Sequence, residues 1–144
     1  MVEYFIEKVN NGDFDKENNK KNDNNEKITN HRENLLKKFR SYSIKIPTMI
    51  KVNGLVATLA FIKGKSENVY KHIYENINNY YTDNFNSKYN DIIKDILSKG
   101  NDVNSNSYNN IEYQRIVTTT ILSYLLWVKR FSISEISYLL DNES

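Results

Sequence analysis

The positions of the apolar residues predict helices along almost the whole chain. These residues recur three or four positions apart, as on one face of a helix, and no segment shows the strict alternation of a half-buried strand. The pattern predicts helices over residues 2–9, 30–39, 48–62, 66–83, 87–100 and 110–131, and a short one over 134–140. We therefore expect an all-α fold, a compact bundle of about six helices.

Two residues punctuate the apolar segment 39–65, FRSYSIKIPTMIKVNGLVATLAFIKGK. Proline restricts the residue before it and suits the first turn of a helix, so Pro47 predicts a sharp helix start. Gly54 then falls inside that helix, where glycine costs up to about 1 kcal/mol relative to alanine. A glycine on a polar strip allows close approach to the main chain, either by another helix or by a phosphodiester chain.

Charge is distributed unevenly along the chain. The net charge is only +2, but residues 35–65 carry seven basic side chains and no acidic one. A charge run often marks only a solvated face. A solvated helix, however, gains from mixed signs four residues apart, so this bias also indicates an anionic partner.

Length and composition narrow the class of protein. A chain of 144 residues can bury a substantial core, and we expect residues 1–144 to form one helical domain. Residues 10–26 are almost purely polar, so we expect a mobile asparagine-rich loop there. No apolar run approaches the roughly 20 residues of a membrane span, and the start lacks a signal-peptide core. With no cysteine present, we expect a soluble cytoplasmic protein without membrane contact.

Candidate catalytic residues are few. His31 falls at the entry of a charged helix, and His72 is expected on an exposed face beside Lys71. Neither has a nucleophile or metal ligand at productive spacing. Asp91 and Asp95 lie four residues apart, which is commoner on a solvated helix face than at a metal site. We expect no enzyme activity, no metal and no cofactor.

Two polar strips carry the candidate nucleic-acid contacts. On a helical wheel, Lys51, Gly54, Thr58 and Lys65 fall within about 60° of one another. On the last long helix, Arg115, Thr119, Ser123 and Arg130 fall within about 80°. A protein that follows RNA regardless of sequence needs spaced cations and polar donors. The predicted RNA-binding residues are Lys45, Lys51, Gly54, Thr58, Lys63, Lys65, Arg115, Lys129 and Arg130.

The apolar residues of the last long helix suggest a second role for it. Leu122 and Leu126 fall within its polar sector, which predicts either a protein interface or a broader core. Trp127 falls on the opposite sector with Tyr124 and Phe131. We expect Trp127 in the core rather than on the surface as a platform for base stacking.

Two blocks of sequence resemble a known family, the small helical subunit of type III-B CRISPR effector complexes (Cmr complexes). The first block matches at Pro47, Thr48, Met49, Ile50, Asn53, Gly54, Leu55, Thr58, Leu59, Ala60, Phe61 and Lys63. The second matches at Tyr113, Arg115, Thr118, Trp127, Val128, Lys129, Arg130 and Phe131. A tyrosine-rich helix between them, VYKHIYENINNYY, is also similar, and the core that carries the resemblance covers residues 27–131.

The chain departs from the family pattern in three places. Threonines 118–120 stand where the family carries an acidic residue, the asparagine-rich loop after a short first helix resembles an insertion, and the tail after Phe131 differs. These departures concern contacts of the termini more than the identity of the family.

The resemblance implies a non-catalytic part of an antiviral ribonucleoprotein. Such subunits stack in several copies beside the backbone subunits and follow the guide RNA and target RNA, while other subunits cleave. We expect Lys51 and Arg115 to face a common side, so that RNA can lie across both helices. Two alternatives remain: an interaction module whose basic strip meets an acidic protein surface without touching RNA, and an unrelated helical hydrolase.

Overall fold

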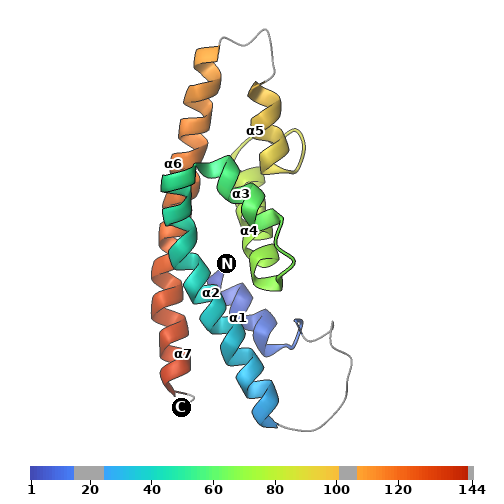
Figure 1. The fold of residues 1–144 in the computed structure, drawn as a ribbon, viewed down its shortest axis with the longest axis vertical. Helices are drawn as coiled ribbons and strands as arrows, with labels where there is room; N and C mark the ends of the chain where they lie inside the picture. The colour runs from blue at the N-terminus through green and yellow to red at the C-terminus, as the bar shows by residue number, and fades with distance from the viewer. Residues whose placement is uncertain (15–24, 101–106, 143–144) are drawn as a thin grey trace.

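The structure is a computed structural model that describes residues 1–14, 25–100 and 107–142. These residues form α1 (Val2–Asn10), α2 (Asn25–Asn53), α3 (Leu55–Lys63), α4 (Asn68–Asn84), α5 (Ile92–Gly100) and α6 (Ser107–Phe131). A π-helical turn (Ser132–Ile136) then leads into α7 (Ser137–Asn142), and the described ranges hold no strand. The prediction of an all-α fold is confirmed. Because α6, the turn and α7 continue as one rod, the expectation of about six helices is also met (Figure 1).

Two long rods organise the molecule. The rod of α6 and α7 runs the full height of Figure 1, and α2 crosses it obliquely in contact with both α6 and the π-helical turn. The short helix α1 packs on α2, α4 contacts α2 and α3, and α5 bridges α3 and the upper part of α6.

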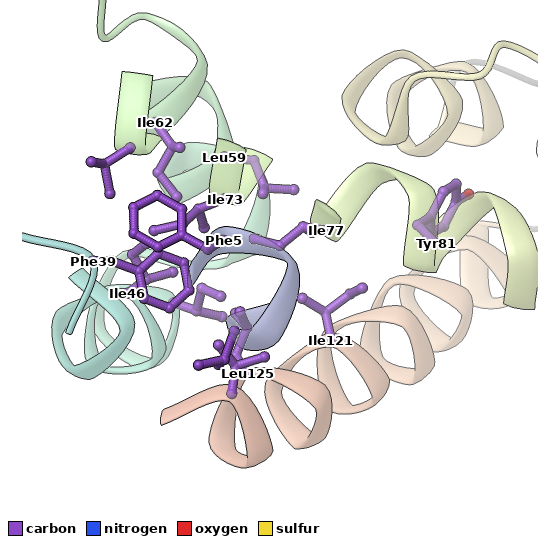
Figure 2. Packing of buried hydrophobic residues seen from close by; sticks show 14 of the residues in the cluster. Phe5, Phe39, Ile46, Leu59, Ile62, Ile73, Ile77, Tyr81, Ile121 and Leu125 are labelled. Atoms are coloured by element: carbon purple, nitrogen blue, oxygen red, sulfur yellow. The ribbon is translucent and has the colours of Figure 1, made fainter. Parts of the chain in front are cut away.

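The core lies where these helices meet. Phe5 of α1 stacks on Phe39 of α2 with ring centroids 4.3 Å apart. Apolar side chains from α3, α4 and α6 close around this pair (Figure 2). The fully buried members include Ile46, Leu59, Ile62, Ile73, Ile77, Tyr81, Ile121 and Leu125. Helix α5 adds the buried Ile92 and Ile96.

The predicted start of a helix at Pro47 is wrong. Pro47 lies inside α2, which runs over Asn25–Asn53 and so joins the separate helices predicted over 30–39 and from residue 48. An interior proline removes one main-chain hydrogen bond at a cost of about 3 kcal/mol. Ile46, Pro47 and Ile50 are all buried, and their packing offsets that cost.

The helix breaks instead at Gly54, which was expected inside a continuous helix. Its φ of +86° lies in the left-handed region that glycine adopts freely, and it is the residue that precedes α3. The Gly54 N–H donates to the Ile50 carbonyl at 2.9 Å, and its own carbonyl accepts from Thr58 N–H at 3.2 Å. α2 and α3 therefore have different axes, so a single wheel drawn over residues 48–65 does not apply.

The end of the chain also differs from its prediction. The short helix expected over 134–140 is not separate, because the rod continues through the π-helical turn into α7. The Ser43 and Ser132 hydroxyls hydrogen-bond to each other inside the structure, tying α2 to this turn. At the other end, most of the predicted loop 10–26 falls on residues 15–24, which lie outside the described residues, while Asn10 and residues 25–26 are helical.

The rod over Ile111–Asn142 meets a length and composition criterion for a membrane span. This rod has 32 residues. Its most apolar stretch has a mean hydropathy of 1.2, and 28% of that stretch is buried. This corrects the expectation that no apolar run approaches that length. A single helix of this kind is weak support for a span, since the core helix of a globular protein passes the same criterion.

Two polar residues expected on exposed faces are buried. His72 packs against the rings of Tyr4 and Phe5 at centroid distances of 5.6 and 5.1 Å. Asp95 is fully enclosed between α4, α5 and α6. The sequence pattern of a single helix could not predict the burial of these two residues. α1 covers His72 and the segment before α5 covers Asp95, on helix faces whose sequence is polar.

Candidate functional site

A groove of about 690 Å³ lies between the α2–α3 corner, α5 and α6. Its walls come from segments far apart in sequence, which the packing of α3 and α6 against α5 brings together (Figure 1). The lining residues are Asn53, Gly54, Leu55, Val56, Ala57, Ala60, Ile96, Ile111, Gln114, Arg115, Thr118 and Thr119. Arg115 is the one charged residue among them, so the lining carries no carboxylate.

The main chain at the corner is open to this groove. A Cβ added to Gly54 would meet no atom within 4 Å, so glycine is required here by its φ and not by crowding. α3 begins without a side-chain cap. The first N–H groups of a helix lack partners within the helix and carry partial positive charge. Those of Leu55, Val56 and Ala57 belong to residues that line the groove.

Arg115 provides the cation of the opposite wall. It is exposed on α6, and its neighbours on that wall carry hydroxyl groups. Thr119 Oγ1 donates to the Arg115 carbonyl at 2.9 Å, and Ser123 Oγ donates to the Thr119 carbonyl at 2.9 Å. The threonine and serine hydroxyl protons are thus used within the helix, and the Arg115 guanidinium is the strong donor on this wall.

The structure brings together some of the predicted site residues. Gly54 and Arg115 line the same groove, and Lys51 is exposed in the last turn of α2, three residues before Gly54. Thr58 is only 1% exposed, and its hydroxyl donates to the Gly54 carbonyl at 2.8 Å. Its side chain supports the corner from inside and does not face solvent.

Other predicted cations lie away from the groove. Lys63, at the far end of α3, pairs with Asp91, and this hydrogen bond raises the pKa of Lys63. The Lys65 ammonium lies 4.4 Å from the centre of the Phe61 ring. Lys45 is exposed on α2. None of these three lines the groove.

The far end of α6 carries a separate surface. Lys129 and Arg130 follow Arg115 by 14 and 15 residues, or about 20 Å along a helix. The prediction that Trp127 is in the core is wrong: Trp127 is 58% exposed, and Arg130 lies 5.2 Å from its ring. The buried face of α6 carries Val117, Ile121, Leu125 and Val128 instead.

The two leucines expected at an interface are half-buried. Leu122 packs against the core cluster, and Leu126 lies one turn further along the same side of α6. Leu122 thus has contacts inside the molecule, in keeping with the alternative of a broader core.

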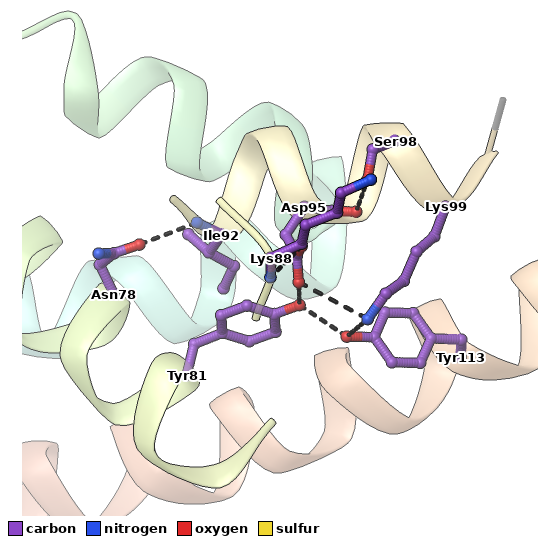
Figure 3. A network of polar contacts seen from close by, with 8 residues as sticks. All are labelled: Asn78, Tyr81, Lys88, Ile92, Asp95, Ser98, Lys99 and Tyr113. Carbon is purple, nitrogen blue, oxygen red and sulfur yellow. Dashed lines mark hydrogen bonds and ion pairs between the residues drawn. The ribbon is translucent and has the colours of Figure 1, made fainter. Parts of the chain in front are cut away.

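Sequence reasoning missed a polar network that holds α5 against α4 and α6 (Figure 3). The Tyr81 hydroxyl donates to the buried Asp95 carboxylate, which also accepts from the Lys88 N–H at 2.9 Å. The Tyr113 hydroxyl of α6 lies 2.6 Å from the Tyr81 hydroxyl and accepts a hydrogen bond from Lys99 Nζ at 2.8 Å. Ile96, which lines the groove, follows Asp95 directly.

The charges in this network depend on those contacts. Burial alone would raise the pKa of Asp95, but hydrogen bonds from Tyr81 and the Lys88 N–H, with the charge of Lys99, hold that pKa below its usual value. Burial and the bond to Asp95 raise the pKa of Tyr81. Asp95 is therefore an ionised carboxylate at neutral pH, enclosed by its donors. The one feature of the sequence that could have indicated this network is the spacing of four residues between Asp95 and Lys99, which is typical of an ion pair on a helix.

No group of three histidine, aspartate or glutamate side chains suited to a metal ion occurs in the part of the chain that the structure describes. The groove lining likewise brings no histidine or carboxylate to Arg115. Its chemistry is that of a surface for an anion with an apolar neighbour.

Comparison with models of known protein families shows to which family the chain belongs. The model of the CRISPR-associated protein family Cas_Cmr5 matches residues 16–135. The chain belongs to the Cas_Cmr5 family. No curated protein and no solved structure matches it.

Membership of Cas_Cmr5 confirms the resemblance seen in the two sequence blocks and makes the chain a CRISPR-associated subunit of the Cmr type. The matched residues include the α2–α3 corner, α5 and the lining residues of α6. The groove is therefore part of the Cas_Cmr5 region and does not belong to an added segment.

Proposed function

We propose that this Cas_Cmr5 chain is a non-catalytic small subunit of a type III-B CRISPR effector complex that acts in the cytoplasm. Several copies stack beside the backbone subunits, and the groove between the α2–α3 corner and α6 contacts the backbone of the guide or target RNA. The observation that carries the proposal is that the Gly54 main chain and the Arg115 guanidinium line one groove without a carboxylate.

Each part of the corner suits a phosphate. An exposed glycine lets a phosphodiester approach the main chain, and uncapped N–H groups at the start of α3 favour negative charge. Arg115 supplies a guanidinium, which matches the geometry of phosphate oxygens. Lys51 adds a cation at the end of α2. These contacts read no base, as expected of a subunit that follows RNA of any sequence.

Lys45, Lys129 and Arg130 extend the proposed contact along the molecule. They lie outside the groove, and we assign them weaker contacts with phosphates further along the strand. Lys63 has its ammonium tied to Asp91, and Lys65 lies over an aromatic ring. The main affinity in this proposal therefore comes from the corner and Arg115.

One observation favours the second candidate function, a protein-interaction module without RNA contact. Half of the residues that line the groove have apolar side chains, and the large side chains Val52 and Leu97 are exposed on the neighbouring helices α2 and α5. An acidic, partly apolar protein segment would satisfy the same surface.

Reversing charge at the groove tests the RNA proposal. The double variant Lys51→Glu and Arg115→Glu should weaken binding of the assembled complex to RNA equally for all sequences. The slope of log affinity against log salt should fall by about 1 for each phosphate that the variant no longer neutralises. Binding is measured by fluorescence anisotropy with two RNA targets of unrelated sequence at several salt concentrations.

The matched control is Lys71→Glu on α4, which reverses an exposed charge that does not line the groove. It should leave both the affinity and the salt slope within error of the parent complex. An unchanged slope in the double variant, in complexes that still assemble, contradicts the phosphate contact. Adding Lys65→Glu separately measures the contribution of the far end of α3.

A further inference from the structure

The groove has two chemically different ends. Its polar end comprises Gly54 and Arg115 with Thr119. The other end is walled by Ala60 of α3 and Ile96 of α5, with Ile111 from the start of α6. Along α6 the lining residues run from Ile111 through Arg115, one turn further on, to Thr119, so the apolar Ile111 lies directly beside the cation.

The groove is too large for a phosphate alone. Its volume of about 690 Å³ falls within the range of about 300–1,000 Å³ typical of pockets for small organic molecules. Ala57 and Ala60 of α3 contribute only methyl groups to the lining, so side chains of this helix fill little of the groove. The surface fits a molecule that is anionic at one end and apolar at the other.

We infer that the apolar end receives an unpaired nucleobase of the RNA strand whose phosphate lies at the Gly54–Arg115 end. This inference rests on the proposed function and assigns the ligand class of the same groove. A nucleotide joins an anionic phosphate to a flat, weakly polar ring within one unit. The Arg115 guanidinium can stack on that ring, as arginine does on exposed bases in single-stranded RNA.

The charge of the lining favours a nucleotide over an amphipathic peptide. A peptide brings main-chain N–H groups that need acceptors, whereas the charged and main-chain donors of the polar end are Arg115 and the first N–H groups of α3. A phosphodiester offers acceptors only. The hydroxyl of Thr118, which also lines the groove, offers a lone pair or proton to a polar edge of the nucleotide.

The test compares two ligands on the full-length protein by NMR. One is the uridine hexamer, and the other is an abasic ribose-phosphate hexamer with the same charge. The uridine hexamer should shift the amide signals of Gly54 and Arg115 and also those of Ala60 and Ile96. The abasic hexamer should shift only the first pair and bind about tenfold more weakly.

A variant that fills the apolar end of the groove provides the second part of the test. Ala60→Phe places a ring in the apolar end, and because Ala60 is exposed the core is not disturbed. This variant should bind both hexamers with equal affinity, at the level of the abasic one. The control Val52→Phe adds the same kind of bulk at an exposed position outside the lining and should keep the tenfold preference.

The outcomes separate this inference from the proposed function. If the uridine hexamer shifts Gly54 and Arg115 but leaves Ala60 and Ile96 unmoved, the base pocket is overturned while the phosphate contact stands. If neither hexamer shifts Gly54 or Arg115 at ligand concentrations high enough to detect the weak binding of a single subunit, and the assembled complex gives no crosslink to this chain, both fall. If Ala60→Phe disrupts assembly with partner subunits and leaves the preference intact, the apolar end binds a protein and the inference is wrong.

Discussion

Gly54 carries the largest conformational demand among the individual residues of the site. Its φ of +86° allows α2 to end and α3 to begin within one residue, and Thr58 holds its carbonyl with both N–H and hydroxyl. The sequence indicated that this glycine was special but assigned it to a helix interior. Spacing alone cannot distinguish a glycine that is tolerated in a helix from one that ends it.

Gly54→Ala should lower the free energy of unfolding by about 1–2 kcal/mol, since a Cβ at positive φ is strained even in open space. The chain supplies a control in Gly64, whose φ of −74° suits any residue. Gly64→Ala should be neutral or stabilise by up to about 1 kcal/mol. Urea unfolding of both variants measures this, and equal effects at the two positions would contradict the assignment.

His72 makes stability depend on pH. Burial, followed by the charge of Lys8, lowers the pKa of His72 to about 4, whereas the unfolded chain takes up this proton near pH 6.5. The unfolded state therefore binds more protons between these values, and stability falls as pH drops through that window. Between pH 7 and pH 5 the loss should be about 2 kcal/mol.

Replacing the imidazole isolates this effect. His72→Phe keeps an aromatic ring among Tyr4 and Phe5 and cannot titrate. Its free energy of unfolding should change between pH 7 and pH 5 by about 2 kcal/mol less than that of the parent chain. The values come from urea titrations at each pH. Parallel pH profiles for the two proteins would show that His72 does not carry the dependence.

At the scale of the helices, sequence periodicity predicted most of the helices. It failed where contacts between distant parts of the chain determine the ends of a helix. The pattern located α1, α4 and α6 because each presents one apolar face to the core. Pro47 misled it, because burial of Ile46 and Ile50 outweighs the local penalty of an interior proline. A local signal cannot include contacts made by residues far along the chain.

The candidate site was predictable only in part for the same reason. Arg115 and Gly54 were both selected by sequence, but only the packing of α3 and α5 on α6 shows that they share a groove. The wheel placed Trp127 in the core because Tyr124 and Phe131 lie on its side of α6. No pattern on α6 alone shows which side α2 covers.

The network around Asp95 should fix α5, and with it one wall of the groove. Asp95→Asn leaves Lys99 without a carboxylate and weakens the bond from Tyr81, so we expect a loss of about 2–3 kcal/mol in stability. Tyr113→Phe removes the hydroxyl that accepts from Lys99 and should cost about 1–2 kcal/mol.

A double-mutant cycle tests whether the two positions act together. The double variant should lose less than the sum of the single variants, because both remove parts of one network. Tyr138→Phe is the control: Tyr138 is exposed on α7, and its change should stay within about 0.5 kcal/mol. Strictly additive losses for Asp95 and Tyr113, measured by urea unfolding, would contradict a coupled network.

At the scale of the whole molecule, the positive charges do not form one continuous strip. Gly54 and Arg115 line the groove and Lys51 lies outside its lining in the last turn of α2, while Lys129 and Arg130 lie further along α6, Arg130 near the exposed Trp127. Lys63 is held by Asp91. The positive bias of residues 35–65 was visible in sequence, but none of its basic side chains lines the groove, whose one charged residue, Arg115, comes from α6.

Membership of Cas_Cmr5 gives this distribution a purpose within the proposal. A subunit that lies beside a long RNA strand needs one firm contact and several weak ones, because each copy covers only a few phosphates. We propose that the corner and Arg115 supply the firm contact and that the outlying cations supply the weak ones. Affinity then accumulates over copies, and one subunit alone binds RNA weakly.

Photocrosslinking in the assembled complex tests this account most directly. A target RNA with 4-thiouridine at its uridines is bound, irradiated and digested, and the adducts are mapped by mass spectrometry. We expect adducts on this chain at the α2–α3 corner around Gly54 and on α6 around Arg115, absent from the Lys51→Glu and Arg115→Glu double variant and retained in Lys71→Glu. Adducts on neighbouring subunits in the same sample, with none on this chain, would contradict an RNA contact in this groove.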